Sequence, residues 1–160
     1  MTTYYQFHDS PLGTLLLTGN GVAVTGVHVA AGMYVLDVGP DWVCDSGQVV
    51  LTRLRRELDA YFGGRLRSFG VALEPHGTPF QKRVWAALAQ IPFGETRTYG
   101  QQARAIGQPS AVRAVGAANG RNPIGIVLPC HRVIGAKGEL TGYAGGLEAK
   151  EFLLKLEAGA

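Results

Sequence analysis

The sequence predicts an α+β fold in two parts, an antiparallel sheet backed by one helix and then a helical region. Three observations predict it. Before about residue 48, short β-prone runs alternate with clusters of turn formers. One amphipathic stretch of helix length follows them. After residues 75–77, helix start signals and helical periodicity replace the strand pattern. We therefore expect two domains, residues 1–77 and residues 78–160.

Three strands are predicted in the first domain, at residues 4–7, 14–18 and 22–29. Turn formers at residues 9–13 and 19–21 separate them. Connections this short join neighbouring antiparallel strands. We therefore expect the three strands to form a meander.

An amphipathic helix is predicted from about residue 48 to residue 62. Its apolar positions recur at helical spacing, and Gly63 with Gly64 supplies a stop signal. We expect its apolar side to cover one face of the sheet. That side comprises Leu51, Leu54, Leu58, Tyr61 and Phe62.

The second domain opens with a strong helix start. Thr78 can cap the helix, Pro79 suits its first position, and Gln81 completes a capping box with Thr78. Phe80, Val84 and Leu88 then share one face of this helix. We expect the helix to end at residues 91–94, which include a proline and a glycine.

Two short helices follow. Thr98 is the expected cap of a helix at residues 99–106, and Ser110 is the expected cap of a helix at residues 111–118. A tight turn at residues 107–109 separates them, an arrangement typical of a helix-turn-helix.

The second of these helices has unusually small side chains. A helix that reads bases in the major groove carries several long polar side chains, and this one has only Arg113. Small residues permit close approach to DNA, which favours recognition by shape or of a lesion. The same pattern fits an alanine-rich core helix equally well, and both interpretations stay open.

The composition narrows the class of protein. The 160 residues, 46% of them hydrophobic, suffice for one substantial core or two small ones. No apolar segment approaches the roughly 20 residues that span a bilayer, and the N-terminus has no signal-peptide pattern. Cys44 and Cys130 form no disulfide framework, and no Cys-x-x-Cys or paired-histidine spacing predicts a metal site. We expect a cytoplasmic protein without a metal.

Charge differs between the two parts of the chain. Residues 1–78 contain five Lys or Arg and seven Asp or Glu, a net charge of −2. Residues 79–160 contain ten and five, a net charge of +5, and the two add to the +3 of the whole chain. A positive half with helical periodicity favours a polyanionic partner such as nucleic acid.

The segment most indicative of chemistry surrounds Cys130. An apolar run at residues 124–128, read as a strand, precedes it, and His131 and Arg132 follow it. Cationic and hydrogen-bonding neighbours favour the nucleophilic thiolate. In an extended segment, however, consecutive side chains point to opposite faces, so His131 needs a bridging water or a third residue to take the thiol proton. A buried, inert cysteine is the alternative.

These residues resemble the acceptor-site signature of the O6-alkylguanine-DNA alkyltransferases, also called methylated-DNA–protein-cysteine methyltransferases, of the stand-alone constitutive type. The first domain resembles this family's ribonuclease-H-like domain in its strand pattern and its 10–13 turn, and the second resembles its winged-helix-like domain. The matching segments are residues 93–96, Tyr99, residues 113–116, 122–123, 129–133 and 142–147, Lys150 and Glu151.

The resemblance implies direct DNA repair. Such a protein flips O6-alkylguanine, and also O4-alkylthymine, out of double-stranded DNA from the minor groove and transfers the alkyl group irreversibly to its own cysteine, here Cys130. It uses no cofactor, acts once per molecule, and needs neither a membrane nor an obligate protein partner. A displacement of this kind requires a soft thiolate and a donor that stabilises the departing base.

The resemblance also assigns catalytic roles. His131 acts through a water as the base for Cys130, and Glu157 orients His131. Asn122 braces the turn near Cys130. Tyr99 assists flipping and donates a proton toward N3 of guanine.

The DNA contacts and the base pocket follow from the same resemblance. Arg113 enters the base stack in place of the flipped nucleotide, and the remaining DNA contacts are Tyr99, Gly100, Ala111 and Ala117. Tyr143, Ala144, Gly145, Val133 and Lys150 form the base pocket, where the carbonyls of Cys130 and Val133 accept the guanine amine. Some relatives have serine at the position of Ala144, so here only a backbone amide can serve O6.

Three other classes fit parts of the pattern. A lesion-binding relative without transfer activity lacks the acceptor cysteine, which this chain has at position 130. A transcription regulator requires more base-reading side chains than residues 111–118 provide. A cysteine hydrolase forms an acyl thioester that water can cleave, whereas an alkyl thioether offers no route to turnover. No other feature of the sequence suggests an acyl substrate.

Overall fold

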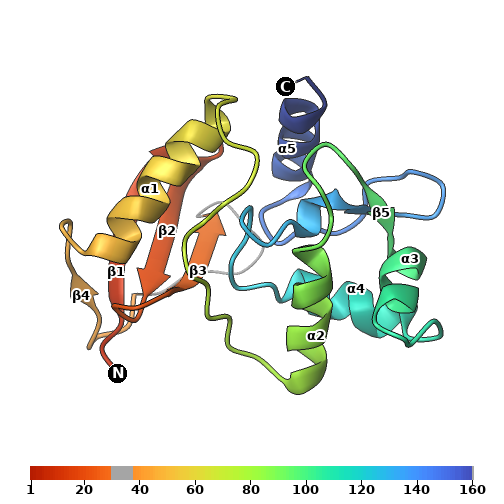
Figure 1. The fold of residues 1–160 in the computed structure, drawn as a ribbon, viewed down its shortest axis with the longest axis horizontal. Coiled ribbons are helices and arrows are strands. Elements are labelled where there is room, and N and C mark those ends of the chain that lie inside the picture. The colour runs from red at the N-terminus through yellow and green to blue at the C-terminus, as the bar shows by residue number, and fades with distance from the viewer. Residues whose placement is uncertain (30–37, 160) are drawn as a thin grey trace.

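The computed structural model describes residues 1–29 and 38–159. A sheet covered by one helix lies beside a helical part, and the two are in contact (Figure 1). The strands are β1 (Tyr4–Ser10), β2 (Gly13–Gly19), β3 (Val24–Val29), β4 (Val43–Cys44), β5 (Arg97–Thr98) and β6 (Val133–Ile134). The helices are α1 (Val49–Phe62), α2 (Pro79–Leu88), α3 (Tyr99–Ala105), α4 (Val112–Gly120) and α5 (Leu147–Gly159), with a 3₁₀ turn, η1 (Cys130–Arg132).

The predicted meander is confirmed for β1, β2 and β3, which pair antiparallel in chain order. The short strand β4 extends this sheet by pairing parallel with β1, so the sheet is not wholly antiparallel as predicted. Strand β3 begins two residues later than predicted, at Val24. The cause is a turn in which the Asn20 side chain accepts the amides of Val22 and Ala23.

Helix α1 covers one face of the sheet, as predicted (Figure 1). Its N-cap is Gln48, whose side chain accepts the amide of Leu51, and its C-cap is Gly63. Its buried residues are Leu51, Leu54, Leu58 and Tyr61. Phe62, which was also predicted to be buried, is only partly buried.

Both helices that begin after a threonine in the second part start with a complete capping box. Thr78 and Gln81 exchange hydrogen bonds at the start of α2, as predicted, and Thr98 and Gln101 do so at the start of α3. The predicted capping of α4 by Ser110 is wrong. This helix begins at Val112 without a side-chain cap, because Ser110 lies within the preceding turn.

Helix α4 exposes most of its small residues and buries one of them, Ala118, so each of the two interpretations of its sequence holds for one side of the helix. Its buried residues are Val115, Ala118 and Asn119. Arg113 and Ala117 lie on the exposed side of the helix. Ala114 and Ala117 therefore belong to an accessible surface, whereas Ala118 belongs to the core.

Residues 124–128 do not form a strand, contrary to prediction. Ile124, Ile126 and Leu128 are buried, but the amides of residues 127 and 128 bond to carbonyls only two and four residues earlier. Ile126 has a φ of 71°. A branched residue in that region is strained by about 1–3 kcal/mol. The apolar run therefore reflected burial, which a packed loop satisfies as well as a strand does.

Backbone bonds join the sheet to this loop. The Val27 amide donates to the Pro123 carbonyl at 2.9 Å, and the Gly125 amide donates to the Val27 carbonyl at 3.1 Å. Strand β3 is the strand nearest the helical part in Figure 1. The loop that leads to Cys130 is thereby fixed to the sheet. Within the part of the chain that the structure describes, no helix has the length and hydrophobicity of a transmembrane span.

Candidate active site

Cys130 is buried, with only 6% of its surface exposed, at the first position of the 3₁₀ turn η1. The Asn122 side chain holds it there. Its Nδ2 lies 3.3 Å from the Cys130 Sγ and donates to the Leu128 carbonyl at 2.8 Å, while its Oδ1 accepts the Ile124 amide at 3.0 Å. One amide thus fixes both the thiol and the loop before it.

The sequence-based picture of Cys130 in an extended segment is wrong. A 3₁₀ helix has three residues per turn, so Cys130 and His131 diverge by about 120° rather than pointing to opposite faces. The same change of direction sends Arg132 away from the thiol and toward Glu157.

Burial raises the pKa of the Cys130 thiol, while the hydrogen bond from Asn122 and the positive charge of Lys150 oppose that rise. The cation that favours the thiolate is therefore Lys150 and not Arg132, the neighbour suggested by the sequence. A raised pKa means that the resting side chain is a neutral thiol. Its reaction as a thiolate needs a base.

His131, the next residue after Cys130 in the sequence, forms a buried histidine–carboxylate pair with Glu157. The His131 Nε2 lies 2.7 Å from the Glu157 Oε2, and both residues are buried. Burial lowers the pKa of His131 despite the nearby carboxylate, so the ring is neutral at pH 7. Burial opposes ionisation of Glu157, but hydrogen bonds from His131, Arg132 and Tyr61 outweigh it and lower its pKa to about 2.

These charge states fix the tautomer of His131. An ionised carboxylate only accepts hydrogen bonds, so the His131 Nε2 must carry the proton. A neutral ring then has its lone pair on Nδ1. That Nδ1 is buried and has no hydrogen-bond partner in residues 1–29 and 38–159. The ring is therefore ready to accept a proton at this nitrogen.

Two further side chains complete the carboxylate site. Arg132 donates to Glu157 through Nε at 2.8 Å and through Nη2 at 3.0 Å, and its Nη1 reaches the Ile91 carbonyl. The Tyr61 hydroxyl lies 2.6 Å from the Glu157 Oε2. The sequence places Arg132 beside the thiol and predicts only a packing role for Tyr61, because no local pattern relates residues so far apart in the chain.

Lys150 is fully buried on α5. Its Nζ donates to the Val133 carbonyl at 2.6 Å and the Thr141 carbonyl at 2.8 Å. The Cys130 carbonyl accepts the Val133 amide. Both carbonyls predicted to receive a guanine amine thus already have one partner, and each retains a second lone pair.

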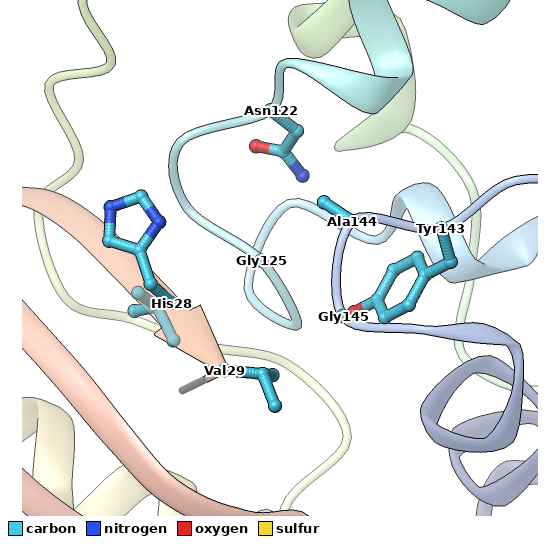
Figure 2. Close-up of a pocket in the computed structure, with 8 residues that line it drawn as sticks. His28, Val29, Asn122, Gly125, Tyr143, Ala144 and Gly145 are labelled. Carbon is cyan, nitrogen blue, oxygen red and sulfur yellow. The ribbon is translucent and has the colours of Figure 1, made fainter. Parts of the chain in front are cut away.

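A small pocket lies between β3 and this site (Figure 2). Val29 and His28 come from β3, and Asn122 and Gly125 come from the loop before Cys130. Of the predicted pocket residues, Tyr143, Ala144 and Gly145 line it, whereas Val133 and Lys150 do not. Its volume is about 40 Å³, far below the roughly 300 Å³ at which small-molecule pockets begin.

The predicted DNA contacts gather on α3 and α4. Tyr99 is half-buried, and its hydroxyl donates to the Thr141 carbonyl at 3.0 Å. Its ring lies next to Gly116, where an added Cβ would be 3.9 Å from it. Arg113 and Ala117 are exposed, and Gly100 and Ala111 are partly exposed.

Two family models match the chain. The 6-O-methylguanine DNA methyltransferase ribonuclease-like domain matches residues 3–75, and the DNA-binding domain of the same family matches residues 79–159. The chain belongs to this family. It is thus a transferase of the class that repairs alkylated DNA.

Curated relatives in this family match over nearly their whole length. A methylated-DNA–protein-cysteine methyltransferase of Methanosarcina acetivorans is 54% identical over 96% of this chain and 97% of its own length. A protein of the same name from Mycobacterium bovis is 49% identical over 96% of this chain and 92% of its own.

Solved structures of the family share the fold. The structure of Mycobacterium tuberculosis OGT in complex with DNA has a TM-score of 0.91 and 48% identity, covering 98% of this chain and 93% of that one. The structure of the O6-methylguanine methyltransferase from the same organism has a TM-score of 0.89 and 47% identity, covering 99% and 94%.

Proposed function

We propose that this protein repairs double-stranded DNA by transferring the alkyl group from O6 of guanine to the Sγ of Cys130. The observation that carries the proposal is the buried Cys130 thiol, held by Asn122 next to a neutral His131 whose Nδ1 is free to accept a proton. The family of the chain supports the reaction type. We extend the proposal to O4-alkylthymine, which presents an equivalent alkyl–oxygen bond.

The residues divide the chemistry between them. The thiol proton passes through a water to the His131 Nδ1, and Glu157 stabilises the resulting imidazolium. The thiolate attacks the alkyl carbon, a carbon–sulfur bond forms, and the carbon–O6 bond breaks. Its electron pair leaves with guanine, and Tyr99 supplies a proton toward N3. The alkyl group cannot be removed from the thioether that remains, so each molecule acts once. The transfer needs no cofactor.

The α3–turn–α4 unit is the proposed DNA surface, in the minor groove. The outward-facing small residues of α4 allow close approach, and Arg113 is the long side chain available to fill the base stack. Gly100, Ala111 and Ala117 then face the backbone. The net charge of +5 on residues 79–160 supports this surface. We assign DNA contact and transfer to residues 78–160, support of the site to residues 1–77, and no obligate protein partner.

To become a base pocket, this small pocket must widen until it reaches Cys130 and Val133, which do not line it, because its present volume holds only a few waters. Three glycines allow its wall to move. Gly142 and Gly146 have positive φ values, and Gly145 packs against Tyr143. In the opened pocket Tyr143 lies along the alkyl group, the Ala144 amide serves O6, and the Val133 carbonyl, backed by Lys150, receives the amine.

Intact-mass analysis tests the proposal. The protein is mixed with a duplex that contains one O6-methylguanine, and the modified peptide is then mapped. We expect one added methyl group on Cys130, saturating at one per molecule. Cys130→Ser should abolish the transfer and still bind the duplex, and the matched control Cys44→Ser should react normally. Binding without any mass change, or methylation at another residue, contradicts the proposal.

A further inference from the structure

Tyr61 reaches the proposed active site from the other part of the molecule. It lies on α1, the helix that covers the N-terminal sheet, and it is fully buried. Its hydroxyl is 2.6 Å from the Oε2 of Glu157, a residue 96 positions later in the chain. The N-terminal part therefore contributes a polar group to the charge network that serves Cys130.

Packing alone does not account for this hydroxyl. The Tyr61 ring contacts Phe69 and Phe93, with centroids 5.4 Å and 6.1 Å away, and a phenylalanine would make the same contacts. The hydroxyl instead meets an ionised carboxylate. Burial and the charge of Glu157 raise the pKa of Tyr61 well above its usual value, so the group stays protonated and donates.

The hydroxyl shares one oxygen with the group that sets the base. The Glu157 Oε2 also contacts the His131 Nε2 at 2.7 Å and the Arg132 Nη2 at 3.0 Å. Three donors at one oxygen fix the rotation of the carboxylate, and each of them stabilises part of its negative charge. The Tyr61 hydroxyl therefore controls both where the carboxylate points and how strongly it attracts the imidazolium form of His131.

We propose that Tyr61 is a positioning residue for alkyl transfer, which orients Glu157 and through it sets the basicity of His131. The inference rests on the proposed function. It assigns to the N-terminal part a direct role in the reaction rather than support of the fold alone.

The sign of the effect follows from the charges that face His131. Glu157 favours its protonation, and Arg132 and Lys150 oppose it. Among the described residues, Cys130, Tyr61 and Tyr143 also lie near this network, and burial raises the pKa of each, so all three are neutral where His131 titrates. Loss of the Tyr61 hydroxyl leaves more of the carboxylate charge for His131, so the pKa of His131 rises. As the pH is lowered, the transfer rate of the variant should therefore begin to fall at a higher pH than that of the wild type.

The experiment compares Tyr61→Phe with the wild type by the single-turnover rate of Cys130 methylation across pH. The acid limb is the part of the profile where the rate falls as His131 becomes protonated. We expect this limb to lie about half a pH unit higher in Tyr61→Phe. At a pH within the limb, the rate of the variant should then be about threefold below that of the wild type. The matched control is Tyr5→Phe, which makes the same change on β1, where the ring packs against Phe7 and Trp42. Its profile should coincide with that of the wild type.

A second control separates positioning from packing. Phe69→Leu loosens the contacts of the Tyr61 ring but retains the hydroxyl. It should lower thermal stability without moving the acid limb. An unmoved limb in Tyr61→Phe, or an equal shift in Phe69→Leu, overturns the inference. Failure of the wild type to methylate Cys130 instead overturns the proposed function, so the two failures are distinguishable.

Discussion

At the scale of single residues, the protonation states around Glu157 decide what Cys130 can do. Arg132, Tyr61 and His131 keep this carboxylate ionised even though it is buried. Its charge favours the protonated form of His131, which is the form that the proposed proton transfer produces. The thiol, in contrast, rests in its neutral form because burial raises its pKa. In the proposed reaction the thiolate therefore forms only when the thiol gives up its proton to a base.

The rate of transfer should depend on pH through His131. Burial lowers the pKa of His131 below 6.5, and only the neutral ring can act as a base. The transfer rate should therefore hold steady as the pH falls to about 6.5 and decline only below that value. Quenched single-turnover assays with methylated duplex measure it. A decline that begins above pH 7 contradicts the assigned protonation state.

Asn122→Ala should damage both stability and chemistry. It leaves the buried Ile124 amide without a partner, at a cost of about 1–3 kcal/mol, whereas the Leu128 carbonyl keeps its bond from the Cys130 amide. It also removes the hydrogen bond to the Cys130 Sγ, so the transfer rate should fall at least about tenfold.

Asn119→Ala is the control for this variant. Asn119 is equally buried, but its amide pairs with Gln102, away from the thiol. Urea unfolding should show a comparable loss of stability, while the transfer rate of the folded protein stays at the wild-type value. Equal losses of rate in the two variants would assign the effect to stability alone.

At the scale of elements, the predictions from sequence were accurate for helix starts and stops, because these depend on side chains that bond to backbone groups only a few residues away. The capping box at Thr78 and the stop at Gly63 were both predicted from residue type and spacing. The two-residue strands β4, β5 and β6 escaped prediction because they are too short for any periodicity. Helix α5, which supplies Glu157 and Lys150, was not assigned as an element, although both residues were recognised by resemblance.

Gly145→Ala should impair the loop that forms the pocket wall. A Cβ at this position would lie 2.7 Å from the Tyr143 ring and 3.2 Å from Val29. The ring must shift, so we expect a several-fold slower transfer and a loss of about 1–3 kcal/mol. Single-turnover rates and thermal denaturation measure the two effects.

Gly138→Ala provides the comparison for this loop. Its φ of +83° makes alanine costly by about 1–2 kcal/mol, yet an added Cβ meets nothing within 4 Å. It should lose stability and keep the wild-type rate. An unchanged rate in Gly145→Ala as well would show that the wall does not need Tyr143 in its present position.

At the scale of the whole molecule, the two parts share one core. A continuous cluster of buried residues runs from Leu15 and Leu54 through Val84 to Leu153. Backbone bonds between Val27 and the loop before Cys130 reinforce it, as does the bond from Tyr61 to Glu157. Contacts of this extent couple the stability of the active site to that of the N-terminal sheet.

The two parts should unfold together. The chain has one tryptophan in each, Trp42 and Trp85. In Trp42→Phe only Trp85 fluoresces, and in Trp85→Phe only Trp42 does. For each variant, the urea midpoint by fluorescence should coincide with its own midpoint by far-ultraviolet circular dichroism. Separate midpoints would mean that the N-terminal part melts without disturbing the site.

Features that depend on local chemistry could be predicted from the amino-acid sequence. Turn formers and helix caps act over a few residues, so the order of the main strands and helices could be predicted. The segment from Pro129 to Val133 drew attention to Cys130, and the spacing of further segments indicated the family. The roles of individual site residues remain predictions.

Which groups come into contact depends on the tertiary structure. It placed the Tyr61 hydroxyl on Glu157, turned Arg132 away from the thiol, and made Lys150 the cation that favours the thiolate. The apolar run before Cys130, predicted to be a strand, is a packed loop in the structure. Such contacts join residues far apart in the chain, and burial then sets their pKa values, so no local pattern in the sequence encodes them.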